Sequence, residues 1–334
     1  MPNETAPSGM PLLEVTNLVK EFPVRKNLFD KAMAGKNLKV HAVDGVSFSL
    51  KKGEVLGLAG ESGSGKSTTG RLALRLLDPT SGSVKFEGID LTTLKPEELR
   101  KLRPRMQMVF QDPLSSLSPR MSIGAAIRDG LDIHNVGPAS GRDDEVRALM
   151  EKVGLTPADF LFKKYPHQIS GGQAQRVVIA RALALHPDFL VADEPIAMAD
   201  VSVRALIMEL LKKLKDEHDL TYLFITHDLA TAKYLCDRVA VMYLGRIVEI
   251  GPKDEVFRRP HHPYTKALLN AVPVPDPDRR RTHELPRGEI PSAVFPPAGC
   301  HFHPRCPFAT PACEQERPPL RDLGSGHQSA CILN

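Results

Sequence analysis

The chain has 334 residues, a formal net charge of +4 and 25% charged residues. This length suits one large or two modest domains with an ample core, and the ordinary charge balance gives no indication of nucleic-acid binding. No run approaches the ~18–20 apolar residues that span a bilayer, and residues 1–10 lack the basic start and apolar stretch of a signal peptide. We therefore expect a cytoplasmic protein whose membrane role, if any, depends on a partner.

Residues 12–250 alternate short apolar runs with helical segments, which is typical of an α/β domain with a mostly parallel sheet. The basic stretch 25–41 lacks periodicity and is predicted to be a loop. Residues 122–164 show helical spacing without strand patterns, which indicates an inserted helical subdomain at about 112–175. Strands are predicted at Leu13–Val15, Val46–Leu50, Glu54–Ala59, Gly82–Phe86, Met106–Phe110, Phe189–Ala192, Tyr222–Thr226, Val239–Tyr243 and Arg246–Ile250.

A glycine-rich loop follows the third predicted strand and precedes helical spacing that runs from Ser67 to Leu77. It reads G-x-x-x-x-G-K-S-T and consists of Gly60, Glu61, Ser62, Gly63, Ser64, Gly65, Lys66, Ser67 and Thr68. Such a loop closes backbone N–H groups around phosphate oxygens, while its lysine adds charge and its serine hydroxyl reaches Mg²⁺. A flexible glycine turn is the alternative, but the strand and helix on either side favour a nucleoside triphosphate site.

Two further motifs lie downstream of this loop. Ser170, Gly171, Gly172 and Gln173 open a helix predicted to reach Ala184, where two glycines free backbone N–H groups for an anion; an ordinary capping loop is the alternative. The apolar run from Phe189 ends in Asp193 and Glu194. We expect Asp193 to hold Mg²⁺ and Glu194 to polarise an attacking water, rather than both being merely solvated acids.

The composition changes after Gly251. Fifteen of the 29 prolines lie beyond this point, and we expect residues 251–334 to form an irregular extension. Four of the five cysteines, Cys300, Cys306, Cys313 and Cys331, lie in the last 35 residues. In a cytosolic chain such a cluster indicates a metal or redox site before it indicates disulfides. The remaining Cys236 is predicted to be a small buried residue.

The glycine loop, the S-G-G-Q-x-Q-R segment and the D-E strand, in this order, resemble the ATP-binding subunit of an ATP-binding cassette (ABC) transporter over residues 12–250. The resemblance implies a P-loop ATPase core with a mixed sheet and an inserted helical subdomain. It also implies a head-to-tail dimer in which each ATP lies between one subunit's phosphate loop and the S-G-G-Q of the other. ATP then closes the dimer, and hydrolysis reopens it.

The resemblance assigns further roles. Gln111 matches the glutamine that contacts Mg²⁺ and the water and communicates with membrane subunits, and His227 matches the histidine at the γ-phosphate. Phe22 is expected to stack on adenine, and Asp200 belongs to the loop at the dimer interface. As isolated residues, a glutamine, a histidine or a phenylalanine are more often structural.

Two residues depart from the family pattern. Ile169 replaces the usual leucine before S-G-G-Q, and Ala197 stands where a serine hydroxyl normally faces the dimer interface. The second change predicts unequal ATP sites, and hence a heterodimer with a related ATPase subunit.

Three segments resemble the oligopeptide/dipeptide importer branch, namely 111–120, 261–265 and 299–307 with Cys313 and Cys331. In that branch the four cysteines can ligate a [4Fe–4S] cluster. Four thiolates suit a cubane, and no C-x-x-C knuckle typical of structural zinc is present, so iron–sulfur is favoured over zinc, and zinc over thiols or disulfides. His301 and His303 are possible substitute ligands, although packing or exposure is the simpler expectation.

The leading interpretation is an ATPase on the cytoplasmic face of the cell membrane that powers peptide import. Its expected partners are two transmembrane permease subunits, docked near Gln111 and the helical subdomain, and an extracytoplasmic substrate-binding protein. Oligosaccharide or nickel uptake is an alternative. A soluble cassette ATPase in repair or translation is less favoured, because coiled coils and a second cassette are missing. A redox protein would need electron partners that the sequence does not indicate.

Overall fold

The computed structural model describes residues 10–24, 38–196, 201–271 and 288–333, without the side chains of 201, 202 and 218. Its contacts divide the chain into two compact units. The first comprises Met1–Leu50, Leu56–Thr92 and Thr226–Asn334, and the second comprises Lys51–Val55 and Thr93–Ile225.

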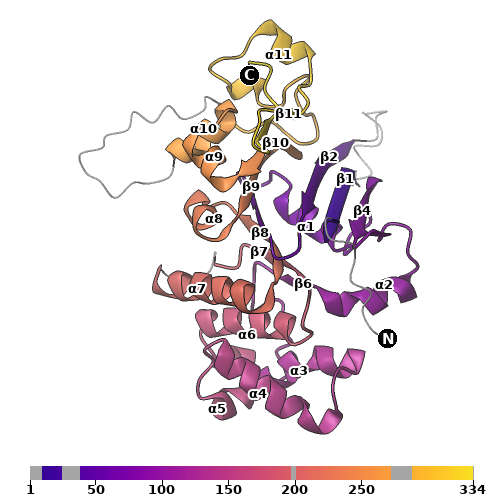
Figure 1. The fold of residues 1–334 in the computed structure, drawn as a ribbon, viewed down its shortest axis with the longest axis vertical. Coiled ribbons are helices and arrows are strands. Elements are labelled where there is room, and N and C mark those ends of the chain that lie inside the picture. The colour runs from indigo at the N-terminus through magenta and orange to yellow at the C-terminus, as the bar shows by residue number, and fades with distance from the viewer. Residues whose placement is uncertain (1–9, 25–37, 197–200, 272–287, 334) are drawn as a thin grey trace, which may run out of the picture. The chain divides into compact units, whose positions relative to one another are not determined.

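The first unit contains an antiparallel sheet with the strand order β2-β1-β4-β5, of which β1, β2 and β4 are visible side by side in Figure 1. In this sheet Phe22 pairs with Val40, and Leu13 pairs with both Leu50 and Phe86. The strands are β1 (Leu13–Pro23), β2 (Lys39–Leu50), β4 (Ser81–Phe86) and β5 (Ile89–Asp90).

The same unit contains a second, mixed group of strands in the order β11-β12-β10-β9-β3. β3 and β9 are parallel, whereas β10, β12 and β11 follow in antiparallel pairs. The strands are β3 (Val55–Ala59), β9 (Arg238–Tyr243), β10 (Arg246–Pro252), β11 (Arg321–Asp322) and β12 (Gln328–Ser329). The helices of this unit are α1 (Lys66–Ala73), α8 (Leu229–Leu235), α9 (Lys253–Arg258), α10 (Pro263–Asn270) and α11 (Pro311–Gln315), with a 3₁₀ turn at His303–Arg305.

The second unit combines three parallel strands with a helical region. β7 lies between β6 and β8 and is buried along its whole length, as expected for a parallel strand covered on both faces. The strands are β6 (Met106–Val109), β7 (Phe189–Asp193) and β8 (Thr221–Thr226). The helices are α2 (Pro96–Leu102), α3 (Ile123–His134), α4 (Arg142–Lys152), α5 (Ala158–Phe162), α6 (Gly171–Leu183) and α7 (Val201–His218), with 3₁₀ turns at Arg103–Arg105, Ala139–Gly141 and Pro166–Gln168.

The helical subdomain packs α3 closely against its neighbours α4, α5 and α6. At Gly124 on α3, an added Cβ would collide with the ring of Phe162 at the end of α5. A small residue therefore permits this close packing, and the sequence prediction of helices without strands over 122–164 is confirmed.

Two sequence predictions are wrong in part. The predicted loop 25–41 ends earlier, because residues 39–41 belong to β2, where His41 pairs with Glu21; residues 25–37 lie outside the described part. The extension after Gly251 is less irregular than expected, since α9 and α10 are helical and β12 pairs with β10. Short amphipathic helices between prolines leave too few turns for a periodic signal. The domain boundary at 251 stays a prediction.

Cys236 is fully buried, as predicted, and it packs against β3. An added Cβ at Gly57 would lie 2.7 Å from its sulfur, so this pair of small residues brings the two segments close together. Among the described residues no helix is long and apolar enough to cross a membrane.

Candidate nucleotide-binding site and cysteine cluster

The residues of the predicted phosphate loop form a turn between β3 and α1. Gly60 has φ 154° and Gly65 has φ 103°, conformations that residues with a Cβ rarely adopt. At both positions an added Cβ would collide with a backbone carbonyl, that of Met242 or Ala42. The glycines therefore allow the loop to lie directly against neighbouring backbone.

Lys66 begins α1 and is 5% exposed. Its ammonium donates hydrogen bonds to the carbonyl oxygens of Gly60 (2.8 Å) and Glu61 (2.9 Å). The charge is thus held within the loop, where it can serve phosphate oxygens. Ser67 and Thr68 follow in the first turn and are partly exposed.

Phe22 and His227 also belong to the first unit. Phe22 lies on β1 with its side chain partly exposed, and the Lys20 ammonium lies 5.1 Å from the centre of its ring. His227 follows β8 directly and is exposed. The next residue, Asp228, caps α8, where its side chain accepts from the Ala230 N–H at 2.8 Å. Both side chains are accessible.

In the second unit the structure brings together two predicted catalytic residues. Gln111 donates from Nε2 to the Glu194 carboxylate at 3.0 Å. Glu194 has φ 47°, a left-handed backbone conformation that is uncommon for a non-glycine residue. Its N–H donates to Ile225 O at 3.0 Å. Asp193 ends β7 and is 1% exposed.

The S-G-G-Q segment forms the exposed start of α6. The Ser170 hydroxyl accepts from the Gln173 N–H (3.2 Å), and the Gln173 side chain accepts from the Ser170 N–H (2.9 Å), a reciprocal capping box. An added Cβ at Gly172 would lie 2.8 Å from Val203, whereas one at Gly171 would meet nothing within 4 Å. Packing within the described residues therefore does not explain the glycine at position 171.

Asp200 and the departure at Ala197 lie outside the described residues. The departure at Ile169 is described, and this residue is partly buried just before the cap of α6.

The four C-terminal cysteines line one small cavity together with His262 and Phe302. Burial raises the pKa values of Cys300, Cys306 and Cys331, and neighbouring thiols of the cluster raise them further. Within the described ranges no group of three or more His, Cys, Asp or Glu residues that could hold a metal ion is found.

The nearby histidines have other partners. His301 Nδ1 lies 3.2 Å from Leu244 O, and burial lowers the pKa of His301 to about 4. His303 Nδ1 lies 2.9 Å from Cys300 O. Burial lowers the pKa of His262 to about 3, so its neutral ring accepts from the Tyr264 N–H at 3.1 Å. These contacts favour packing roles for the histidines.

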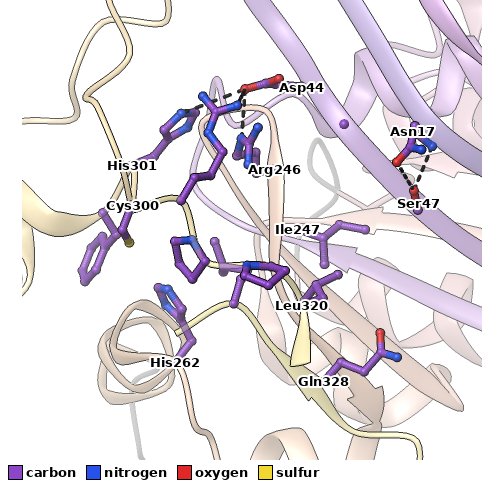
Figure 2. Close-up of a pocket in the computed structure, with 18 residues that line it drawn as sticks. Asn17, Asp44, Ser47, Arg246, Ile247, His262, Cys300, His301, Leu320 and Gln328 are labelled. Carbon is purple, nitrogen blue, oxygen red and sulfur yellow. Dashed lines mark hydrogen bonds and ion pairs between the residues drawn. The ribbon is translucent and has the colours of Figure 1, made fainter. Parts of the chain in front are cut away.

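A second cavity, of about 400 Å³, lies beside Cys300 and is shown in Figure 2. Asp44 of β2 forms ion pairs there with Arg246 of β10 (2.9 Å) and with Arg317 of the extension (3.5 Å). Although burial acts to raise it, the pKa of Asp44 is lowered by these arginines, so the carboxylate stays charged. The cysteine-rich extension is therefore bound to the first sheet by a charged cluster.

Sequence reasoning missed two residues that contact the phosphate loop. Arg305 forms a two-point ion pair with the Glu61 carboxylate (2.9 and 3.2 Å), and the Tyr264 hydroxyl accepts from the Glu61 N–H at 2.9 Å. Both lie in segments already singled out by resemblance, yet neither carries a motif of its own. The sequence shows only that Arg305 lies between a proline and a cysteine, which does not indicate a partner.

Comparisons with known proteins agree with this geometry. The family model described as ABC transporter matches residues 43–197, and the one described as oligopeptide/dipeptide transporter, C-terminal region, matches residues 248–313. The oligopeptide transport ATP-binding protein AppF of Bacillus subtilis is 46% identical, with 98% of this chain and 99% of that protein covered. A protein of Brucella ovis, provisionally named a peptide import ATP-binding protein, is 49% identical over 96% of this chain and 98% of its own length.

Solved structures extend the likeness to the fold. The ATP-binding cassette MJ0796, in a dimeric post-hydrolysis state bound to ADP and Pi, matches with a TM-score of 0.64 and 29% identity, covering 72% of this chain and 98% of that one. CbiO1 from Clostridium perfringens, part of the transporter complex CbiONQ, matches with a TM-score of 0.62 and 30% identity, covering 75% and 91%. The mixed α/β fold expected from the sequence is thereby confirmed.

Proposed function

The chain belongs to the ABC transporter family and carries the oligopeptide/dipeptide C-terminal region, and we propose that it hydrolyses ATP to power peptide import. The observation that supports this most directly is the phosphate loop, with Lys66 held inside it, in a chain whose relatives over nearly full length are named for oligopeptide transport. Peptides are favoured over oligosaccharides or nickel because of those names.

The proposed chemistry assigns ATP phosphates to the loop from Gly60 to Thr68 and adenine to Phe22. Mg²⁺ would be held by the Ser67 hydroxyl, the Gln111 amide oxygen and Asp193, which are the oxygen donors that this ion prefers. Glu194 would take the proton of the attacking water, with Gln111 orienting its carboxylate and His227 contacting the γ-phosphate.

A second nucleotide-binding subunit completes this proposal. The exposed Ser170, the unfilled space at Gly171, and the dimeric state named for MJ0796 support a role for residues 170–173 at a partner's ATP. The alanine at position 197 favours a related but different ATPase subunit as that partner, with Asp200 at the interface.

Two permease subunits and an extracytoplasmic binding protein are the other proposed partners, which would place the chain on the cytoplasmic face of the membrane. In the second unit the side chains of Leu114, Phe160 (60% exposed) and Tyr165 are exposed. Leu114 lies close to Gln111 in sequence, and Phe160 and Tyr165 belong to the helical subdomain. Exposed apolar side chains can contribute to a docking surface, and these three are the candidates for contact with the permease.

Copurification tests this assembly. The tagged chain, expressed with its genomic neighbours, is expected to bring down two membrane subunits and a second ATPase, and the reconstituted complex is expected to take up peptide only with ATP. Recovery of nucleic acid or ribosomes in place of membrane subunits would contradict the transport role.

We further propose that Cys300, Cys306, Cys313 and Cys331 hold a [4Fe–4S] cluster. The four thiols line one cavity, although the described residues contain no group of His, Cys, Asp or Glu that could hold a metal ion. Four thiolates complete the ligand set of a cubane, and the sequence contains no C-x-x-C knuckle typical of structural zinc. Such a cluster would supply a rigid cross-link within an extension that has little core of its own.

Anaerobically purified protein is expected to contain about four irons and about four sulfides per chain, with a broad visible absorption band. Cys313→Ser should lower the iron content, whereas Cys236→Ser, which changes a buried cysteine outside the cavity, should not. Stoichiometric zinc without iron would exclude the cluster.

A further inference from the structure

Glu61 of the phosphate loop is held at three points, all within the first unit. Its carbonyl oxygen accepts from Lys66 at 2.9 Å, its N–H donates to the Tyr264 hydroxyl at 2.9 Å, and its carboxylate receives both terminal nitrogens of Arg305. The first contact is to the phosphate-binding lysine itself. The other two come from beyond β10, so this single loop residue connects the C-terminal extension to the ATP-binding machinery.

The Arg305 contact is stronger than an ordinary surface ion pair. Arg305 is 8% exposed, and its guanidinium lies 5.8 Å from the ring centre of Tyr243 and 5.9 Å from that of Phe302. Burial acts to lower the pKa of Arg305, but the hydrogen bonds to Glu61 raise it, so the group stays charged. A two-point arginine–carboxylate pair fixes orientation as well as distance, and removing one partner leaves a charge shielded from water.

Arg305 also belongs to the segment that carries the cysteines. It closes the 3₁₀ turn through its N–H to Phe302 O at 3.0 Å, and Cys306 N–H follows with a bond to His303 O at 3.2 Å. Cys300 N–H donates to Cys313 O at 2.8 Å. Arg305 is thus placed by the same short turn that places Cys300 and Cys306, and any constraint on these cysteines is a constraint on Arg305.

Aromatic side chains pack this turn against the rest of the first unit. The Phe302 ring packs edge-on against Tyr243 at 5.3 Å and tilted against Tyr264 at 5.4 Å. Tyr264 is the residue whose hydroxyl receives the Glu61 N–H. The turn and the phosphate loop therefore share one buried aromatic group, which can transmit a displacement of either to the other.

We propose that Arg305 is a positioning residue for the phosphate loop, which acts through Glu61 and couples the cysteine segment to the affinity for ATP. This inference rests on the proposed ATP-binding function. In this proposal Arg305 does not contact the nucleotide itself and acts only through Glu61. Loss of Arg305 shifts Glu61 in the nucleotide-free loop, together with the Glu61 carbonyl that accepts from Lys66. ATP must then reorder the loop in order to bind.

The test compares variants of the full chain by nucleotide binding, with a fluorescent ATP analogue, and by steady-state kinetics in the transporter complex. Arg305→Ala is expected to weaken ATP binding and raise KM about 10-fold, with kcat nearly unchanged, because ground-state and transition-state binding are lost together. Arg305→Lys should recover part of the affinity. Arg317→Ala is the control, since Arg317 also pairs the extension with another part of the first unit, at Asp44, and this variant should bind ATP normally.

Glu61→Gln provides a second route if Arg305→Ala folds poorly, as judged by thermal unfolding. It should weaken binding to a similar extent, and the double variant with Arg305→Ala should be no weaker than either single one, as expected for residues that act as a pair. Cys306→Ser should shift ATP affinity in the same direction, measured by binding alone. Normal ATP affinity in Cys306→Ser would contradict the proposed coupling between the cysteine segment and the phosphate loop.

The outcomes separate this inference from the function it rests on. Normal ATP affinity in both Arg305→Ala and Glu61→Gln, alongside lost binding in Lys66→Ala, would overturn the positioning role and leave the ATPase assignment intact. Normal ATP binding in Lys66→Ala would instead overturn the assignment itself.

Discussion

Lys66→Ala is expected to cause the largest loss, a fall of about 10²- to 10³-fold in ATP hydrolysis together with much weaker ATP binding. The Lys66 ammonium is buried inside the loop and bonded to two of the loop's carbonyl oxygens, so it is positioned before the phosphates arrive. No other group of the loop motif carries a positive charge. Its removal takes away the only positive charge that the loop itself contributes to balance the triphosphate.

Equilibrium binding of radiolabelled ATP and release of phosphate by the complex measure this effect. Lys233→Ala, which removes an exposed lysine from α8 of the same unit, is the matched control and should behave as the unmodified chain does. If Lys66→Ala retained full turnover, the loop would not be the phosphate site.

Glu194→Gln is expected to lower kcat by about 10²- to 10⁴-fold, the usual contribution of a general base, while ATP binding persists. Glutamine keeps the shape of the side chain and can still meet Gln111, which now lies 3.0 Å from the Glu194 carboxylate. What is lost is the negative charge that accepts a proton from water. The expected signature is therefore a bound, uncleaved ATP.

Single-turnover hydrolysis and nucleotide retention distinguish the two effects, and Glu209→Gln, on an exposed face of α7, is the control. The same change in the second ATPase subunit tests the proposed asymmetry. Unequal losses from the two substitutions are expected, and equal losses would argue for two equivalent sites.

The conformation of the proposed nucleotide-binding loop was predictable because its requirements are local. Gly60 and Gly65 adopt backbone angles that other residues avoid, and the capping box of Ser170 and Gln173 lies within four residues. Buried strands such as β7 were predictable for the same reason, since an uninterrupted apolar run indicates burial on both faces. The beginning of β2 was missed because Val40 becomes a strand residue only through its pairing with Phe22.

Contacts between distant segments were not predictable in the same way. The hydrogen bond between Gln111 and Glu194 joins residues 83 apart in sequence, and the Glu61–Arg305 pair joins residues 244 apart. Resemblance to a family suggested roles for the first pair, whereas neither the residue types nor their spacing indicated the second. A buried arginine needs a carboxylate partner, but the sequence alone does not say which one.

The amino-acid sequence by itself therefore determined that this chain binds and cleaves a nucleoside triphosphate within an α/β cassette, because the motifs for that chemistry specify backbone conformation over a few residues. It also determined that four cysteines gather near one end. Only the tertiary structure decided that the turn between Cys300 and Cys306 delivers a buried arginine to the phosphate loop. That contact depends on how strands and helices pack, and packing is a property of the whole folded unit that no local pattern encodes.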